Sequence, residues 1–378
     1  MPALDETLQQ KLSVLSAKHL KREVQETIRT DGVKVIRAGR ELISFSCNDY
    51  LGLSHHPDVK KAAIQAIEQY GTGAGASRLV TGNHPLYAQL ETTLAAYKGT
   101  ESACIFGSGY LANSGIIPAL VGKNDLILAD KLVHACMIDG ARLSGATVLR
   151  FAHNNLEHCK MLLESHAHEH HQCLILTETI FSMDGDRAPI QALSLLAKKY
   201  GAWLMTDDAH GLGVLPKHNS PADIQMGTLS KGAGGYGGYV CGSKTLIEYL
   251  KTAARSLIYS TGLPPGDIAA SIAALKIMAS DPELVAKPLQ NARIFTSLLG
   301  LEPAQSAIVP LMLGENGKAL AASKLLEERR FLVAAIRPPT VPENTARLRF
   351  AFSALHDRTQ IEQLAAIIKE QGWQCPES

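Results

Sequence analysis

The feature that most constrains the fold is an alternation of short apolar runs with helical repeats between residues 47 and 275. The runs have the length of buried strands, and the repeats place apolar residues three or four positions apart, as on one face of a helix. Candidate strands lie at 103–106, 126–129, 147–151, 173–177, 203–206 and 239–241, and the clearest helices at 59–70, 86–94 and 190–200, with Gly201 as the C′ residue of the last. This alternation predicts an α/β fold with a mostly parallel sheet covered by helices on both faces.

Both ends of the chain depart from this alternation. Leucines at positions 4, 8, 12 and 15 predict an amphipathic helix, and apolar runs at 33–36 and 42–45 predict a small hairpin, so that this arm is expected to lie over something larger. Later elements are expected as helices at 268–278 and 318–328, strands at 331–336 and 347–352, and a last helix that begins with a capping box formed by Thr359 and Glu362. We therefore expect an N-terminal arm over 1–45, a large domain over 46–275 and a small α+β domain over 276–378.

Composition excludes several classes of function. The 378 residues carry a net charge of +1 with both signs well mixed, so nothing indicates a nucleic-acid partner. No apolar run approaches the roughly 18 residues needed to span a bilayer, and the N-terminus does not have the pattern of a secretory signal. Seven scattered cysteines without C-x-x-C spacing predict reduced core residues, and the histidine-rich run at 166–171 is expected to be a solvated helix end or loop. We expect a soluble, cytoplasmic protein without a metal or membrane segment.

A lysine surrounded by hydroxyl residues and glycines is the most unusual local feature. Lys231 follows Thr228 and Ser230, and glycines at 232, 234 and 237 fit the G-x-G-x-x-G dinucleotide fingerprint. That fingerprint must open a helix and be followed by an acid about 20 residues later, whereas here a strand-like run follows and no acid stands at that distance. A glycine-rich surface turn is a second alternative. The third is a lysine that forms an imine with a cofactor.

The run at 203–211 favours this third alternative. A short apolar strand ends there in Asp207, Asp208 and His210, and open α/β sheets bind ligands at the carboxyl ends of their strands. A pyridoxal phosphate (PLP) site needs a lysine and an acid that keeps the pyridine nitrogen protonated, so that the ring accepts electrons from a carbanion. Lys231 and an aspartate of this run satisfy that need, although either aspartate could merely cap the following turn.

Other polar residues also stand where strands are expected to end. Ser108 lies in a glycine-containing turn that either presents backbone N–H groups to a phosphate or is a plain helix cap, and Thr228 could reach the same phosphate. His134 is either structural or a flat partner for a pyridine ring, and Ser182 is placed to touch the cofactor. Three arginines crowd a short C-terminal segment, either as surface residues or as forks for a substrate carboxylate: Arg337, Arg347 and Arg349.

Six motifs, in this order, resemble those of the α-oxoamine synthases, a family of PLP enzymes of fold type I. The motifs are Asn48-Asp-Tyr-Leu-Gly52, Gly71-Thr-Gly-Ala-Gly-Ala-Ser-Arg78, Gly82-Asn-His-Pro85, Phe181-Ser-Met-Asp-Gly-Asp186, Asp207-Asp-Ala-His-Gly211 and Gly227-Thr-Leu-Ser-Lys231. The resemblance covers nearly the whole chain and is highly specific, because so many motifs match in the right order. It implies an acyltransferase that works as a homodimer with PLP at the subunit interface.

The resemblance also implies roles for individual residues. Lys231 would be the Schiff-base lysine, Asp207 the partner of the pyridine nitrogen and His210 that of the ring oxygen, with His134 stacked over the ring. The other cofactor positions would be Ser108, Gly109, Tyr110, Ser182 and Thr228, with Thr261 or Ser260 offered to the phosphate bound by the partner subunit. The substrate positions would be Arg22, Asn48, Ser77, Arg337, Thr340 and Arg349.

Two further segments, 258–265 and 335–342, resemble one branch of the family. That branch condenses L-alanine with a pimeloyl thioester of CoA or acyl carrier protein in biotin biosynthesis: the lysine amine removes the Cα proton, the carbanion attacks the thioester, and CO₂ is lost. Sister enzymes that use glycine are the alternative, and an oxidoreductase built on the glycines after Lys231 is the third. The chain differs from the family in a shorter connector at 213–226 and in the dense glycines after Lys231.

Overall fold

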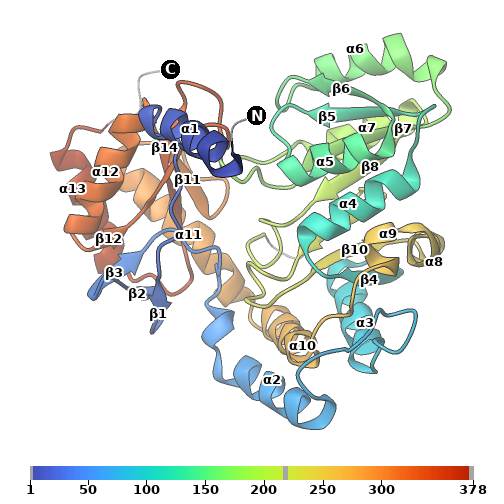
Figure 1. Ribbon diagram of the computed structural model, residues 1–378, viewed down its shortest axis with the longest axis horizontal. Coiled ribbons are helices and arrows are strands. Elements are labelled where there is room, and N and C mark those ends of the chain that lie inside the picture. Colours follow the sequence, from blue (N-terminus) through green and yellow to red (C-terminus); the bar gives the residue numbers. More distant parts are fainter. Residues whose placement is uncertain (1–2, 216–219, 374–378) are drawn as a thin grey trace. The chain divides into compact units, whose positions relative to one another are not determined.

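The computed structural model describes residues 3–215 and 220–373, and the chain forms two compact units (Figure 1). The central unit comprises Asp49–Ser182 and Asp186–Pro288. The terminal unit comprises Met1–Asn48, Met183–Gly185 and Leu289–Ser378. Residues 216–219 of the shortened connector, and Cys375, lie outside the described residues.

A 7-stranded sheet forms the centre of the central unit. In spatial order it contains β4 (Ser102–Phe106), β10 (Gly238–Gly242), β9 (Ile224–Thr228), β8 (Trp203–Asp207), β7 (Cys173–Glu178), β5 (Leu126–Asp130) and β6 (Thr147–Phe151). Only β10 runs antiparallel to its neighbours, β4 and β9, whereas β9, β8, β7, β5 and β6 pair in parallel. The prediction of a mostly parallel sheet is confirmed. The expected strands are all present, and β9 is an additional strand that the sequence did not predict.

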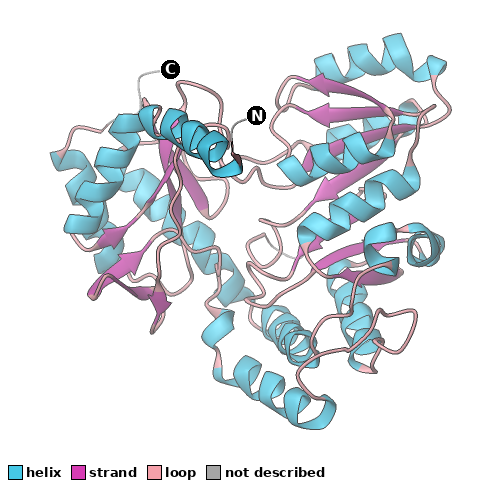
Figure 2. Cartoon of the chain, in the orientation of Figure 1, coloured by secondary structure: helices cyan, strands magenta, loops and turns pink. Residues whose placement is uncertain are grey.

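Helices cover both faces of this sheet, as Figure 2 shows. Ile127 and Ala129 of β5 pack into one apolar cluster, whereas Leu126 and Leu128 pack into another, because alternate residues of a strand point to opposite faces. The first cluster includes residues of α4 (Gly109–Leu120), α5 (Ala135–Ser144) and α8 (Lys244–Ala253). The second includes residues of α6 (Leu156–His166) and α7 (Ile190–Lys199), after which Gly201 has the left-handed φ of +64° expected of a C′ glycine.

Four further helices lie in the central unit. The predicted helices at 59–70, 86–94 and 268–278 are present as α2 (Pro57–Tyr70), α3 (Leu86–Lys98) and α10 (Pro265–Ser280), and α10 packs against both α2 and α3. The short α9 (Arg255–Ile258) packs against α4. Of these helices, α3 packs against β4 and β10 at the antiparallel edge of the sheet.

The terminal unit has two small sheets. One contains β1 (Ile28–Arg29), β2 (Lys34–Arg37), β3 (Arg40–Ser44) and β12 (Phe331–Leu332), in which β2 and β3 form the predicted hairpin. The other contains β11 (Ile308–Gly314), β14 (Ala346–Ala351) and β13 (Ala334–Ile336). The helices α11 (Pro282–Leu299), α12 (Asn316–Glu328) and α13 (Arg358–Glu370) contribute to an aromatic core around Phe45, Phe295, Phe350 and Phe352.

Two details of the terminal unit correct the sequence predictions. The single strand expected at 331–336 is two strands, because β12 pairs with β3 and β13 pairs with β14, with the buried Val333 between them. The last helix does not begin at Thr359: Asp357 is its N-cap, and Asp357 and Gln360 form the capping box. An aspartate caps as well as a threonine does, so the box moves two residues towards the N-terminus.

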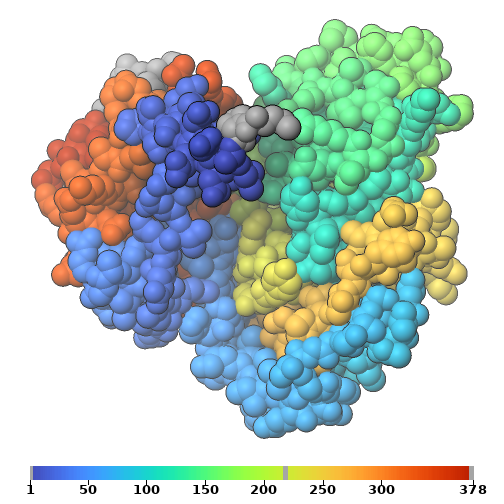
Figure 3. Space-filling model, viewed as in Figure 1, coloured from blue at the N-terminus to red at the C-terminus, as the bar shows by residue number. Residues whose placement is uncertain are grey.

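The N-terminal helix is present as α1 (Leu4–Ala17), but it has no buried residue. Its four leucines are between 40% and 74% exposed, and Figure 3 shows this helix, in dark blue, at the surface. The amphipathic pattern therefore predicted the helix correctly, whereas the expected cover for its apolar face is not found in the described part of the chain. No helix among the described residues is long and apolar enough to cross a membrane.

A buried ion pair joins α3 to the turn after β8. Lys98 Nζ donates a hydrogen bond of 2.6 Å to Asp208 Oδ2, and both side chains are buried. We expect Lys98→Met to lower the free energy of unfolding by roughly 3–5 kcal/mol, because it leaves the Asp208 charge buried without a partner. Urea unfolding measures this change. The double variant with Asp208→Asn should recover much of the loss, and an equal or larger loss in the double variant would contradict this account.

A half-buried cluster of charged side chains makes a prediction about pH. His153 lies between Asp130 Oδ1 at 2.9 Å and Asp186 Oδ2 at 2.8 Å. Burial lowers the pKa of His153, but hydrogen bonds and charges from the two aspartates outweigh it and raise the pKa to about 10. The stabilisation is therefore complete below the unfolded-state pKa of about 6.5 and is lost as pH rises towards the folded-state value.

We expect the free energy of unfolding to fall between these two pH values more steeply in the native protein than in His153→Gln. Groups that titrate elsewhere are present in both proteins, so the difference between the two urea-unfolding series isolates His153. Two parallel pH profiles would show that His153 is not held as a cation.

Candidate active site

Lys231 lies in a loop between β9 and β10, close to two aromatic side chains. Its Nζ is 2.9 Å from His210 Nε2, and His210 Nδ1 is 2.6 Å from the hydroxyl of the buried Tyr50. The loop is partly buried: Gly232 and Ala233 are buried, and a Cβ at Gly232 would lie 2.1 Å from the Leu212 carbonyl oxygen. The dense glycines therefore allow close packing around the lysine.

This geometry excludes two of the alternatives for the loop. The dinucleotide fingerprint requires a helix after the glycines, but Gly238–Gly242 is strand β10. A solvated surface turn is also wrong, since the loop packs against the segment around Leu212. The third alternative, a lysine that forms an imine with a cofactor, stays a prediction.

The two adjacent aspartates at the end of β8 have different partners. Asp207 Oδ2 accepts a hydrogen bond of 2.9 Å from Asn113 Nδ2, and Oδ1 accepts one of 2.9 Å from the backbone N–H of Ala209. Asp208 instead pairs with Lys98. Asp207 thus does cap the following turn, as the sequence allowed, but each carboxylate oxygen can accept more than one hydrogen bond and Asp207 can still bind a further donor.

The N-terminus of α4 lies beside the end of β9. Ser108 caps this helix, and its Oγ accepts a hydrogen bond of 3.2 Å from the backbone N–H of Leu111. A Cβ at Gly109 would lie 3.5 Å from Thr228 Cβ, so the predicted phosphate residues come together. Thr228 Oγ1 is 2.8 Å from Ser230 Oγ and donates to the Gly237 carbonyl oxygen at 2.8 Å. Tyr110 is half exposed and donates through its hydroxyl to Asp139.

His134 is the N-cap of α5 and is electrostatically linked to Lys231 and Asp207. Burial lowers the pKa of His134; the Asp207 charge opposes this effect and the Lys231 charge adds to it. Glu178, the last residue of β7, is opposite Asp207 in the strand register and is buried. Burial, and then the Asp207 charge, raise the pKa of Glu178 well above its ordinary value.

The other predicted residues of the central unit lie on turns and loops. Ser182 is buried in the turn region after β7. Ser77 and Thr261 pair directly through an isolated β-bridge, and the backbone N–H of Gly262 donates to the Ala76 carbonyl oxygen at 2.9 Å. The structure thus brings together one predicted substrate residue and one predicted cofactor residue.

The predicted substrate residues of the terminal unit form two groups. Arg349 Nη1 donates to Asn48 Oδ1 at 3.2 Å. Arg22 Nη2 donates to Thr340 Oγ1 at 2.8 Å, and Arg337 donates to the His19 carbonyl oxygen. Burial, and then the charge of Arg22, lower the pKa of Arg337. Two guanidinium groups that repel one another in this way are suited to an anion.

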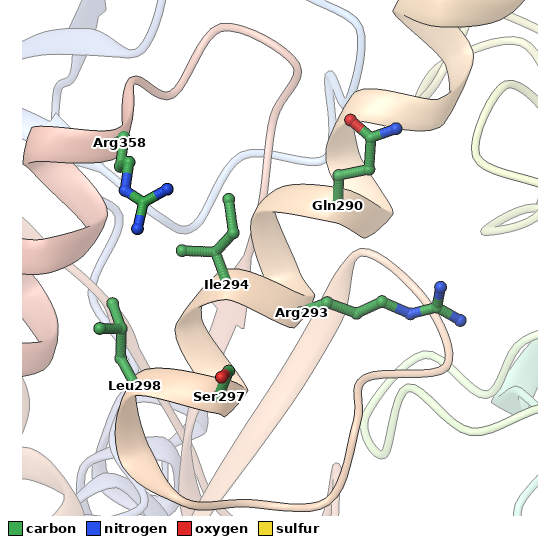
Figure 4. Close-up of a pocket in the computed structure, with 6 residues that line it drawn as sticks. All are labelled: Gln290, Arg293, Ile294, Ser297, Leu298 and Arg358. Atoms are coloured by element: carbon green, nitrogen blue, oxygen red, sulfur yellow. The ribbon is translucent and has the colours of Figure 1, made fainter.

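Arg347, the third arginine of that segment, is structural. It is buried, and its guanidinium pairs with Asp184 within the terminal unit. A shallow pocket elsewhere in this unit lies between α11 and the start of α13 and is lined by Gln290, Arg293, Ile294, Ser297, Leu298 and Arg358 (Figure 4). It contains none of the predicted site residues. No group of three potential metal ligands occurs among residues 3–215 and 220–373.

Sequence reasoning did not assign a role to four side chains near Lys231 and Asp207: Tyr50, Asn113, Cys136 and Glu178. Tyr50 stands inside the Asn48–Gly52 motif, Cys136 lies two residues after His134, and Asn113 and Glu178 lie within five residues of Ser108 and Ser182, respectively. The sequence did offer one sign of such residues. A polar side chain at a helix or strand position that is expected to be buried needs a hydrogen-bond partner.

Comparisons with known proteins agree with this arrangement. The chain matches the family described as aminotransferase class I and II over residues 40–368. It is 54% identical over 377 residues to the 8-amino-7-oxononanoate synthase of Beijerinckia indica subsp. indica, covering 97% of this chain and 98% of that protein. It is 54% identical over 371 residues to the 8-amino-7-oxononanoate synthase of Methylobacterium nodulans, covering 98% of both chains.

Solved structures share the fold. The serine palmitoyltransferase of S. paucimobilis, solved with a bound adduct of PLP and myriocin, has a TM-score of 0.91 at 28% identity and covers 98% of both chains. The 8-amino-7-oxononanoate synthase of Francisella tularensis has a TM-score of 0.73 at 29% identity, covering 88% of this chain and 99% of that one. The chain belongs to the aminotransferase class I and II family.

Proposed function

We propose that the protein is a PLP-dependent acyltransferase, an 8-amino-7-oxononanoate synthase, which condenses L-alanine with a pimeloyl thioester and releases CO₂. The observation that carries the proposal is 54% identity to synthases of this name over nearly the full length of both chains. Identity to the serine palmitoyltransferase is only 28%. Similarity of fold alone does not separate these two activities, so we assign the substrate from the higher sequence identity to the synthases.

The side chains around Lys231 fit PLP. Lys231 Nζ stands 2.9 Å from His210 Nε2, Asp207 has room for one more donor, and the cap of α4 next to Thr228 offers backbone N–H groups to a phosphate. When bound, PLP supplies an electron sink for a carbanion next to an amine nitrogen. Asp207 would keep the pyridine nitrogen protonated, His210 would donate to the ring oxygen, and His134 would stack on the ring.

Besides binding the cofactor, Lys231 would act as the base of the reaction. Its amine would remove the Cα proton of alanine and return a proton after CO₂ is lost, which requires the amine to be neutral for part of the cycle. Ser182 would complete the contacts with the cofactor. Gly109 and Thr228 would hold the phosphate and so fix the position of the ring relative to Lys231.

The substrate contacts remain proposals that follow the family resemblance. Asn48 and Arg349 form one candidate pair for the alanine carboxylate, since a guanidinium binds a carboxylate in a fork. Arg22, Arg337 and Thr340 form the other candidate group, where an anion would relieve the repulsion between the two arginines. Ser77 is proposed to contact substrate from the central unit.

We further infer a homodimer with the cofactor at the subunit interface. Several large apolar side chains near the Ser77–Thr261 bridge are strongly exposed, namely Leu79 at 60%, Val80 at 74% and Tyr259 at 72%. Exposed apolar groups of this size favour a protein contact. Thr261 would then reach the phosphate of the partner subunit. The cytoplasmic location stays a prediction.

The first test of the proposal is Lys231→Ala. We expect the variant to fold and to lose turnover by at least about 10²–10⁴-fold, because the base is removed. Borohydride treatment of the native protein with PLP should leave a pyridoxyl group on the peptide that contains Lys231, and mass spectrometry detects it. The exposed Lys123→Ala serves as the matched control and should keep both label and activity. Labelling of a different lysine would contradict the assignment.

The second test is Asp207→Asn. The amide cannot hold a protonated pyridine nitrogen by charge, so we expect PLP to remain bound while turnover nearly vanishes. Equilibrium dialysis measures the bound PLP, and steady-state assays measure kcat. Near-normal kcat in this variant would remove Asp207 from its role.

A further inference from the structure

Four side chains form a continuous hydrogen-bonded chain within the central unit, from Asp207 to His134. Asn113 Nδ2 is 2.9 Å from Asp207 Oδ2 and 3.0 Å from Cys136 Sγ. Cys136 Sγ is in turn 2.8 Å from His134 Nδ1. Asn113, Cys136 and Asp207 are all buried, so water does not compete for the two contacts of Asn113, whereas His134 at the end of the series is exposed.

Close packing of two helices brings these four side chains into hydrogen-bonding distance. Asn113 lies on α4, and Cys136 lies in the first turn of α5. A Cβ at Gly140 of α5 would lie 2.6 Å from the backbone oxygen of Asn113. The missing side chain at Gly140 therefore lets the two helix backbones approach closely.

The directions of the hydrogen bonds follow from the charge of Asp207. An ionised carboxylate only accepts, so the amide nitrogen of Asn113 must face Asp207. The same nitrogen gives its second hydrogen to Cys136 Sγ. Asn113 Oδ1 has no hydrogen-bond partner among the described residues, so the amide makes its contacts through nitrogen.

The thiol of Cys136 then has one hydrogen to give. Burial, and then the charge of Asp207, raise the pKa of Cys136 to about 12, so the group stays a thiol at neutral pH. Its sulfur already accepts from Asn113, and its S–H points to the remaining neighbour, His134 Nδ1. A thiol is a weak donor, but here its alternative partners are removed by burial.

A separate observation leads to the same state of His134. The backbone N–H of Cys136 donates to His134 Nδ1 at 3.2 Å as part of the N-cap of α5. An imidazole nitrogen that accepts a hydrogen bond carries no proton, so the ring proton of neutral His134 must be on Nε2. The backbone N–H at 3.2 Å and the thiol at 2.8 Å thus share the one lone pair of Nδ1 and favour the same tautomer, and the thiol is the nearer of the two.

We propose that Cys136 is a positioning residue whose thiol, oriented by Asn113 and Asp207, fixes His134 as the Nε2–H tautomer. His134 then presents an N–H donor on the side of the ring away from α5, where it can bind an oxygen of the substrate. The tautomer is a property of the protein without cofactor. Only its use towards the substrate rests on the proposed function.

The test is the ¹⁵N spectrum of histidine-labelled protein without PLP at neutral pH, with the His134 signals identified by their loss in His134→Gln. We expect Nδ1 in the unprotonated range and Nε2 in the protonated range. Cys136→Ser, which keeps a donor, should give the same pattern. Cys136→Ala, which keeps the backbone contact of residue 136 and loses the thiol contact at 2.8 Å, should move both signals part of the way towards a mixture of the two tautomers.

The matched control is Cys159→Ala, which removes another buried thiol whose side chain packs into the cluster on the opposite face of the sheet. It should leave the His134 signals unchanged. A proton on Nδ1 in the native protein, or an unchanged pattern in Cys136→Ala, would overturn the proposal. These outcomes do not depend on catalysis, so failure of the proposed function remains distinguishable.

Kinetics provides a second readout in the PLP-loaded enzyme. We expect Cys136→Ala to lower kcat by about 10-fold or more, and Cys136→Ser to restore most of the loss. Equal losses of kcat in the serine and alanine variants would contradict a role for the hydrogen-bond donor at this position.

Discussion

Two carboxylates, Asp207 and Asp208, stand side by side at the end of a buried strand. The arrangement of the central unit depends on which side chain binds each of them. Lys98 reaches Asp208 from α3, and Asn113 reaches Asp207 from α4. A buried charge without a partner would cost several kcal/mol, so both helices must be in place before the strand end is stable. As a result, Asp208 is neutralised by its ion pair with Lys98, whereas Asp207 keeps its charge for a cationic partner.

The same site shows how the fold can hold a lysine near a cofactor. Lys231, His210 and Tyr50 form one hydrogen-bonded series, and Asp207, Asn113, Cys136 and His134 form another. The first series starts at Lys231, just after β9, and ends on the Tyr50 hydroxyl; the second starts at Asp207, the last residue of β8, and ends on His134 Nδ1. Parallel strands bring such residues to one edge of the sheet, so residues distant in sequence share one site.

Much of the central unit could be predicted from the sequence, because buried strands there are apolar runs between helical repeats. Strand β9 was missed because Gln225 and Gly227 interrupt its apolar pattern, although all five of its residues are buried. The split of 331–336 into β12 and β13 was missed because strand pairing depends on distant partners, β3 and β14. The motifs identified Lys231, Asp207 and His210, whereas the partners Asn113 and Cys136 depend on the close packing of α4 and α5, which no local pattern encodes.

The proposed reaction joins L-alanine to a pimeloyl thioester and releases CO₂. The most direct measurement is to incubate the purified protein with PLP, pimeloyl-CoA and alanine labelled with ¹³C either at the carboxylate or at the methyl carbon, and to analyse product and gas by mass spectrometry. We expect the carboxylate label to leave as CO₂ and the methyl label to appear in 8-amino-7-oxononanoate, with alanine preferred over glycine. Retention of the carboxylate label in the product, or a clear preference for glycine, would contradict the proposed reaction.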